Sequence, residues 1–155
     1  MRLALEMSPC PTYVATARRW DRNFEDRILR HIADRSDQWV TLEVEKEIGN
    51  IDLKGKVAVV DCVTLWLTNF FVDNQQNIED SFAQAKDQFD RLSEQDGTFI
   101  VVSNEIGMGV HAPTESGRKF ADLQGRMNQY IAGKSDTVVL MVAGIAVPVK
   151  GSLQR

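Results

Sequence analysis

Two short apolar, mostly β-branched runs that end directly in polar side chains constrain the fold more than any other feature. Residues 99–102 lead into Ser103-Asn104-Glu105 and then a turn containing Gly107 and Gly109. Residues 57–60 end in the carboxylate of Asp61. Uninterrupted apolar runs of this length are typical of buried parallel strands, which present functional groups at the carboxyl edge of the sheet. The two runs therefore predict an α/β fold and favour a nucleotide site at that edge.

Strand-like and helix-like patterns alternate along the whole chain. The predicted strands are 11–16, 39–44, 57–62, 98–103 and 137–143, with a short edge strand at 147–150, and the predicted helices are 21–35, 64–72, 77–95 and 114–132. A length of 155 residues predicts one domain, residues 1–155. The alternation predicts a mainly parallel sheet with helices on both faces. Residues 46–56 are interpreted as a surface connection. The long apolar stretch 138–149 is too short to span a bilayer and is interpreted as a core strand.

Composition excludes several classes of protein. The 155 residues carry a net charge of −4, which argues against a dedicated nucleic-acid binder. The only local basic concentration runs from Arg18 to Arg35 and suits a small polyphosphate better than a duplex. Cys10 and Cys62 have no metal-ligand or disulfide spacing, so we expect free buried thiols. No secretory leader pattern is present, and a cytoplasmic location is expected.

Asp61 has the position of a Walker B carboxylate, which helps to hold Mg²⁺ on nucleotide phosphates. Four apolar residues followed by Asp also occur by chance in α/β proteins. No Walker A loop accompanies it. The tripeptide Gly133-Lys134-Ser135 follows a predicted helix, whereas a phosphate loop follows a strand, and its fifth preceding residue is Asn128 rather than Gly. We interpret it as a helix C-cap with Gly133 in the left-handed region.

Arg27, His31 and Arg35 are spaced four residues apart and form one column on the helix predicted over 21–35. One interpretation is a structural histidine beside solvated arginines. The other is functional: two guanidiniums bind triphosphate, and their charge favours neutral imidazole, the nucleophilic form.

Other polar residues allow two interpretations each. Glu43 lies on one strand face with Thr41, where a carboxylate binds either a ribose hydroxyl or a metal, or simply faces solvent. Asn104 and Glu105, followed by two glycines, indicate either a backbone that turns close to a ligand or an ordinary strand-to-loop turn.

The ordered set of segments resembles the bifunctional adenosylcobinamide kinase / adenosylcobinamide-phosphate guanylyltransferase family of cobalamin biosynthesis. The resemblance covers nearly the whole chain. It rests on Tyr13-Val14-Ala15-Thr16, on Arg27-Ile28, His31, Arg35, Trp39 and Glu43, on residues 61–69 and 103–110, on Arg118, Phe120, Asp122, Gly125, Asn128 and Gln129, and on the closing strand with Gly144 and Lys150.

This resemblance implies a P-loop, RecA-like α/β fold and two reactions. Adenosylcobinamide is phosphorylated with ATP or another nucleoside triphosphate, and GMP is then transferred from GTP through a guanylyl-histidine, which releases pyrophosphate. The histidine falls on His31. The implied nucleotide-binding residues are Thr16, Ala17, Arg27, Ile32, Ala33, Asp34, Arg35, Glu43 and Asp61, with Asp61 also as the Mg²⁺ ligand. Asn104, Glu105, Gly107 and Gly109 form a substrate-binding or structural loop. A homo-oligomer, with a trimer favoured, is implied as well.

The chain departs from the family pattern at its start, where the first strand and the Gly-x-x-x-x-Gly-Lys-Ser loop are missing. Residues 2–7 are interpreted as the end of the helix that follows this loop. About twenty residues of the pattern are then lost, and we expect both reactions to be impaired, the kinase reaction more severely. We expect the sheet to tolerate a gap, close up or recruit a strand. The alternative functions are a non-catalytic nucleotide-binding module, another P-loop-type small-molecule kinase, or a structural subunit without a ligand.

Overall fold

The computed structural model describes residues 1–19 and 37–152. Four strands, β1 (Thr12–Ala15), β2 (Val40–Glu43), β3 (Val57–Asp61) and β4 (Thr98–Val102), form one sheet. The α-helices are α1 (Arg2–Met7), α3 (Val63–Asp73), α4 (Ile78–Ser93) and α5 (Glu115–Lys134), and two 3₁₀ helices are η1 (Ile48–Asn50) and η2 (Ile106–Met108). Strands β5 (Val138–Val142) and β6 (Ile145–Lys150) form a hairpin.

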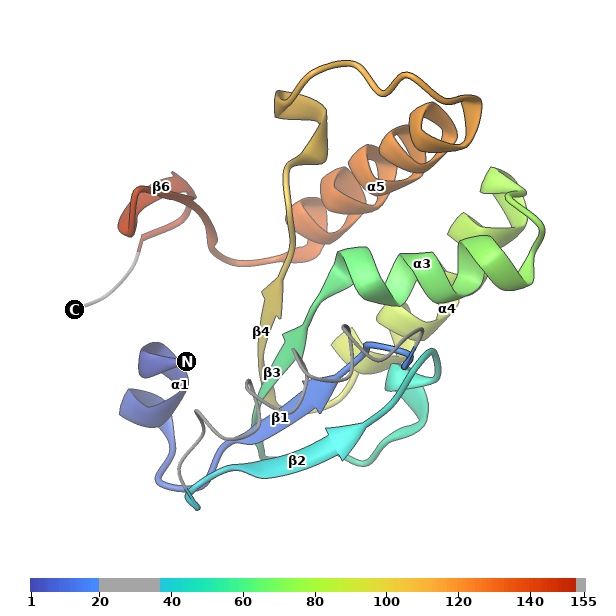
Figure 1. The fold of residues 1–155 in the computed structure, drawn as a ribbon. Coiled ribbons are helices and arrows are strands. Elements are labelled where there is room, and N and C mark those ends of the chain that lie inside the picture. Colours follow the sequence, from blue (N-terminus) through green and yellow to red (C-terminus); the bar gives the residue numbers. More distant parts are fainter. Residues whose placement is uncertain (20–36, 153–155) are drawn as a thin grey trace.

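The four-stranded sheet is entirely parallel and has the order β2-β1-β3-β4. Neighbouring strands pair contiguously, so these four strands leave no gap between them. The register places Glu43 beside Ala15, Ala15 beside Asp61, and Asp61 beside Val102. The last residues of the four strands therefore lie in one row along the carboxyl edge (Figure 1).

Helices cover both faces of the sheet, as predicted. Alternate residues of a strand point to opposite faces. Val14, Ala58 and Val60 contribute to the main core with residues of α3, α4 and α5. Tyr13 and Val59 point the other way and form a smaller cluster with Ala4 of α1. The predicted α/β class is confirmed, and α1 confirms the helix expected over residues 2–7.

The helices that pack on the main face begin and end at residues that the sequence indicates. Asn77 caps α4 by accepting a hydrogen bond from the amide of Asp80, and Thr114 caps α5 through the amide of Gly117. Helix α5 continues through Gly133 to Lys134, which pairs with Asp90 of α4 at 2.6 Å. The left-handed C-cap predicted at Gly133 is therefore wrong, but the rejection of a phosphate loop there agrees with the structure.

The two strands predicted at 137–143 and 147–150 are confirmed as β5 and β6, but the interpretation of residues 138–149 as a core strand is wrong. This stretch turns back on itself at Ala143 and Gly144, both of which have positive φ, and forms the antiparallel pair β5–β6. All of β6 and the end of β5 are exposed. Figure 1 shows the hairpin set apart from the four-stranded sheet. Apolar content alone does not distinguish a buried strand from this hairpin.

Two smaller expectations also need correction. Residues 46–56 are not only a surface connection, because Ile48 and Leu53 are fully buried in the main core. The side chain of Gln95 fixes this segment by accepting from the amide of Leu53 and donating to the carbonyl of Ile51. Of the two thiols, Cys62 is buried as expected, but Cys10 is exposed. None of the described helices is long and apolar enough to cross a membrane.

Candidate functional site

The carboxyl edge of the sheet brings together part of the predicted site. Thr16, Ala17, Glu43 and Asp61 lie at the ends of β1, β2 and β3, and the loop with Asn104 and Glu105 follows β4. Arg27, His31, Ile32, Ala33, Asp34 and Arg35 lie outside the described residues, so their predicted roles stay predictions.

Asp61 is held by a tyrosine on the neighbouring strand. The Tyr13 hydroxyl donates to Asp61 Oδ2 at 2.5 Å. Tyr13 is itself buried and contacts the Trp39 ring edge-to-face, with 6.1 Å between centroids. Asp61 is half-buried. A fixed phenol that occupies one carboxylate oxygen orients the other, which is how a protein prepares a carboxylate for a ligand. The next residue, Cys62, is buried, and this burial raises the pKa of its thiol.

Thr16 is fully buried, and its polar groups serve the fold. Its amide donates to the carbonyl of Asp61, and its hydroxyl donates to the carbonyl of Cys62 at 2.9 Å. Thr16 thus ties the end of β1 to the end of β3. Ala17, the next residue, is half-buried. A nucleotide contact at Thr16 or Ala17 stays a prediction.

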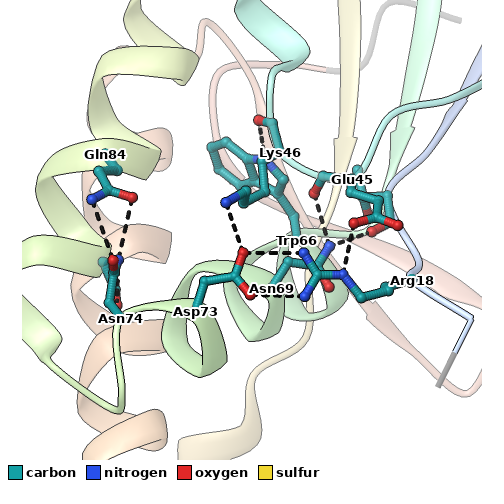
Figure 2. Close-up of polar contacts among 10 residues, drawn as sticks. Arg18, Glu45, Lys46, Trp66, Asn69, Asp73, Asn74 and Gln84 are labelled. Carbon is teal, nitrogen blue, oxygen red and sulfur yellow. Dashed lines mark hydrogen bonds and ion pairs between the residues drawn. The ribbon is translucent and has the colours of Figure 1, made fainter.

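Asn69 of α3 clamps the two segments that follow β1 and β2 (Figure 2). Its side-chain nitrogen donates to the carbonyls of Thr16 and Glu45, both at 2.8 Å. Asn69 is fully buried, and its Oδ1 has no hydrogen-bond partner among the described residues. Nearby, the indole of Trp66 donates to the carbonyl of Lys46 at 2.8 Å. Helix α3 therefore fixes the backbone of both segments.

An ion-pair network lies next to the hydrogen bonds of Asn69. Arg18 donates to both oxygens of Asp73 at 2.8 and 3.1 Å and to Glu45 at 2.6 Å, and Lys46 contacts Asp73 at 2.7 Å. Hydrogen bonds from Arg18 and Lys46 hold the pKa of Asp73 far below its usual value, and those from Asp73 and Glu45 raise that of Arg18. We call Arg18, Glu45, Lys46, Asn69 and Asp73 the charged clamp (Figure 2).

The predicted role of Arg18 and Arg19 in a polyphosphate-binding cluster gains little from this geometry. Arg18 pairs with two carboxylates of the charged clamp, and Arg19 contacts Glu43 at 3.1 Å. The Glu43 carboxylate is exposed and engaged by Arg19. A ribose or metal contact by Glu43 stays a prediction.

On the other side of Asp61, the loop after β4 is held by neutral groups from two helices. Asn128 of α5 accepts from the Ser103 hydroxyl at 2.5 Å and donates to Glu105 Oε1 at 2.8 Å and to the carbonyl of Asn104. The buried Gln124 donates to Ser103 and Asn128. We call Ser103, Asn104, Glu105, Gln124 and Asn128 the amide cluster.

The amide cluster also reaches α3. Asn104 donates from its side chain to the hydroxyl of Thr64 at 2.8 Å. Gly107 and Gly109 follow in the exposed turn around η2, and neither has positive φ. A Cβ added at either glycine meets nothing closer than 3.5 Å. The turn therefore has no steric need of its own for these glycines, which leaves a ligand that approaches the backbone as one reason for them.

Sequence reasoning assigned no role to Tyr13, Asn69, Gln124 or Asn128. A signal was present for Asn69, because it is an uncharged polar residue within the apolar run 63–72 of a predicted helix. Gln124 and Asn128 lie four residues apart on one helix face. No pattern in the sequence pairs Tyr13 with Asp61, which are 48 residues apart.

Comparisons with known proteins show the family to which the chain belongs. The family model described as cobinamide kinase / cobinamide phosphate guanyltransferase matches residues 1–149. The chain is 36% identical to the bifunctional adenosylcobalamin biosynthesis protein CobP of Pseudomonas aeruginosa, over 97% of this chain and 88% of that protein. It is 29% identical to CobU of Escherichia coli K12 and 28% identical to CobU of Salmonella typhimurium LT2. These two matches cover 89% and 92% of this chain and 84% and 87% of the relatives. The matches lend no support to the expected impairment of the two reactions.

Proposed function

The chain belongs to the cobinamide kinase / cobinamide phosphate guanyltransferase family, and from this premise we propose that it transfers GMP through a covalent guanylyl group on His31. Membership makes it an enzyme of adenosylcobalamin biosynthesis. The observation that carries the proposal is the family match over residues 1–149, which includes the column Arg27, His31 and Arg35.

The proposed transfer has two displacements at one phosphorus. Neutral His31 attacks the α-phosphorus of GTP, a nitrogen–phosphorus bond forms, and the bond to the bridging oxygen breaks, so that pyrophosphate leaves. A phosphate oxygen of adenosylcobinamide phosphate then attacks the same phosphorus and breaks the bond to His31. Arg27 and Arg35 stabilise the charge that develops on the phosphate oxygens. The product is adenosylcobinamide-GDP.

The nucleotide is proposed to lie along the carboxyl edge, against Thr16, Ala17, Glu43 and Asp61 and the segment 32–35. The register supports this placement, because Glu43, Ala15 and Asp61 are paired neighbours at the ends of three parallel strands. Ligands of open parallel sheets bind at this edge. The charged clamp supports it as well, since it holds the backbone around Thr16 and Glu45 in one conformation.

Mg²⁺ fits the donor set at Asp61. The carboxylate is half-buried at the strand end, and Tyr13 occupies Oδ2, so that Oδ1 is the oxygen proposed for the ion. The described residues contain no group of three acidic, histidine or cysteine side chains around one point. A single carboxylate such as Asp61 suits Mg²⁺, which is commonly bound by one or two carboxylates together with substrate phosphates and water. When bound, Mg²⁺ offsets phosphate charge.

Three further proposals concern the kinase reaction, the assembly of the protein, and its location and partners. The kinase reaction uses ATP or GTP to phosphorylate the hydroxyl of adenosylcobinamide. The protein assembles as a homo-oligomer, with a trimer favoured. It acts in the cytoplasm on small-molecule substrates and has no nucleic-acid partner.

The proposal is tested by incubating the chain with Mg²⁺ and GTP labelled at the α-phosphate. We expect protein-bound label that acid releases and base does not, as is typical of a phosphorus–nitrogen bond to histidine. His31→Ala should abolish it, and His111→Ala, the matched control at the other histidine, should retain it. Undiminished labelling of His31→Ala, or no labelling of the unaltered chain, would overturn the proposal.

A further inference from the structure

The amide cluster has hydrogen-bonding capacity that its own contacts do not use. Asn104 and Glu105 are exposed, and each makes a side-chain contact with one polar atom, Asn104 Nδ2 with Thr64 and Glu105 Oε1 with Asn128. The Asn104 Oδ1 and the second Glu105 oxygen accept no hydrogen bond from the described residues. Gln124 Oε1 is buried and has no hydrogen-bond partner within the described ranges. The accessible unused acceptors are therefore those of the exposed Asn104 and Glu105.

The loop that continues from this cluster exposes apolar side chains. Ile106 is 37%, Met108 74% and Val110 99% exposed. Three such side chains within five residues, on a turn with glycines at 107 and 109, form an apolar surface beside a polar one. Clustered exposed apolar side chains mark binding sites more often than isolated ones do. Arg118 donates to the carbonyls of Ala112 and Pro113 and fixes the far end of this loop.

Both surfaces lie next to the proposed nucleotide edge. Val102, the residue before the amide cluster, is the paired neighbour of Asp61. Asn104 is bonded to Thr64, which is three residues beyond Asp61 in the chain. A substrate held here is therefore beside the strand end to which the phosphates of the nucleotide are assigned.

The chemistry of the two surfaces selects the class of ligand. Within the amide cluster, Glu105 is the only ionisable side chain, and no lysine or arginine contributes. Carboxamides and hydroxyls both donate and accept, so they match neutral amides better than phosphates, which recruit cations. An apolar rim beside such a cluster fits a ligand with a broad apolar face and carboxamide groups around it.

We propose that the amide cluster, together with Ile106, Met108 and Val110, binds the corrin ring and its carboxamide side chains in the cobinamide substrate. The proposal rests on the proposed function for the identity of the substrate. Asn104 and Glu105 form hydrogen bonds with the carboxamides, and Met108 and Val110 pack against the apolar face of the ring. The loop 104–110 is then a substrate-binding loop rather than only a turn between β4 and α5.

The test measures the affinity of the protein for cobinamide by equilibrium dialysis, without any nucleotide. The absorbance of the corrin ring gives the concentration of cobinamide on each side. Asn104→Ala and Met108→Ser should each weaken binding by about fivefold or more, the effect of losing one hydrogen bond or one buried apolar contact. Met7→Ser is the matched control, because Met7 is also exposed (54%) but lies on α1, far from this loop (Figure 1). It should leave the affinity within twofold. Circular dichroism should confirm that each variant is folded.

The outcomes separate this proposal from the function proposed for His31. Unchanged cobinamide affinity in folded Asn104→Ala and Met108→Ser would overturn the substrate-binding loop, whatever the labelling with GTP shows. Weakened affinity in both variants together with unchanged affinity in Met7→Ser supports it, even if His31 is not labelled. An equal loss in Met7→Ser would mean nonspecific adsorption of the corrin ring and would also overturn it.

Discussion

The charged clamp and the amide cluster occupy opposite sides of Asp61, and each is built around one asparagine of a helix. Asn69 of α3 is fully buried and bonds two backbone carbonyls, those of Thr16 and Glu45. Asn128 of α5 is half-buried and bonds mainly side chains, Ser103, Gln124 and Glu105. The first fixes backbone, whereas the second holds side chains that can change partners. Helix α3 thus fixes the backbone beside the proposed nucleotide position, whereas helix α5 holds exposed side chains beside the proposed substrate-binding loop.

The largest effect is expected for Asn69→Ala. The change removes the side-chain amide group that donates to the carbonyls of Thr16 and Glu45, and both carbonyls lose this hydrogen bond. We therefore expect the free energy of unfolding to fall by about 2–4 kcal/mol. Urea unfolding followed by circular dichroism measures it. A loss below about 1 kcal/mol would mean that the clamp does not support the edge.

A smaller loss, about 1 kcal/mol, is expected for Asn128→Ala, since three of its partners, Ser103, Asn104 and Glu105, are exposed and can bond to water instead. The same urea titration compares the two variants. The contrast between the two sides would be wrong if Asn128→Ala destabilised the protein as much as Asn69→Ala.

The smallest effect is expected for Asp73→Asn, which breaks the ion pairs with Arg18 and Lys46. These pairs are partly solvent-exposed, so the loss at pH 7 should be about 0.5–1 kcal/mol. Because the pKa of Asp73 is lowered in the folded state, its contribution is present above the unfolded pKa of about 3.9 and declines as the pH falls below it. Unfolding curves of the two proteins should therefore converge as the pH is lowered from 5 to 2.5. A constant difference over that range would assign the effect to something other than the charge of Asp73.

The elements with strong periodicity or clear caps were predictable from the sequence. Helix α4, expected over 77–95, spans Ile78–Ser93, and the cap predicted at Thr114 is confirmed. Strands β1 to β4 lie within one or two residues of their predicted bounds. The strands of the hairpin β5–β6 were predictable too, but its exposure and its separation from the main sheet were not, because an apolar stretch does not reveal what packs against it. The burial of Leu53 was missed because the residues around it are mostly polar, and only the packing of the segment 46–56 on the core buries this side chain.

For the candidate site, the sequence by itself determined that Asp61 ends one apolar strand and that Asn104 closely follows another, since local patterns of apolar and polar residues encode strands and their ends. Only the tertiary structure decided the partners of these residues: Tyr13 on Asp61, Asn69 on Thr16, and Asn128 on the loop after β4. Those contacts join residues 23 to 53 positions apart, and their existence depends on strand order, register and helix packing rather than on local pattern. The parallel sheet brings them together because its strand ends meet at one edge.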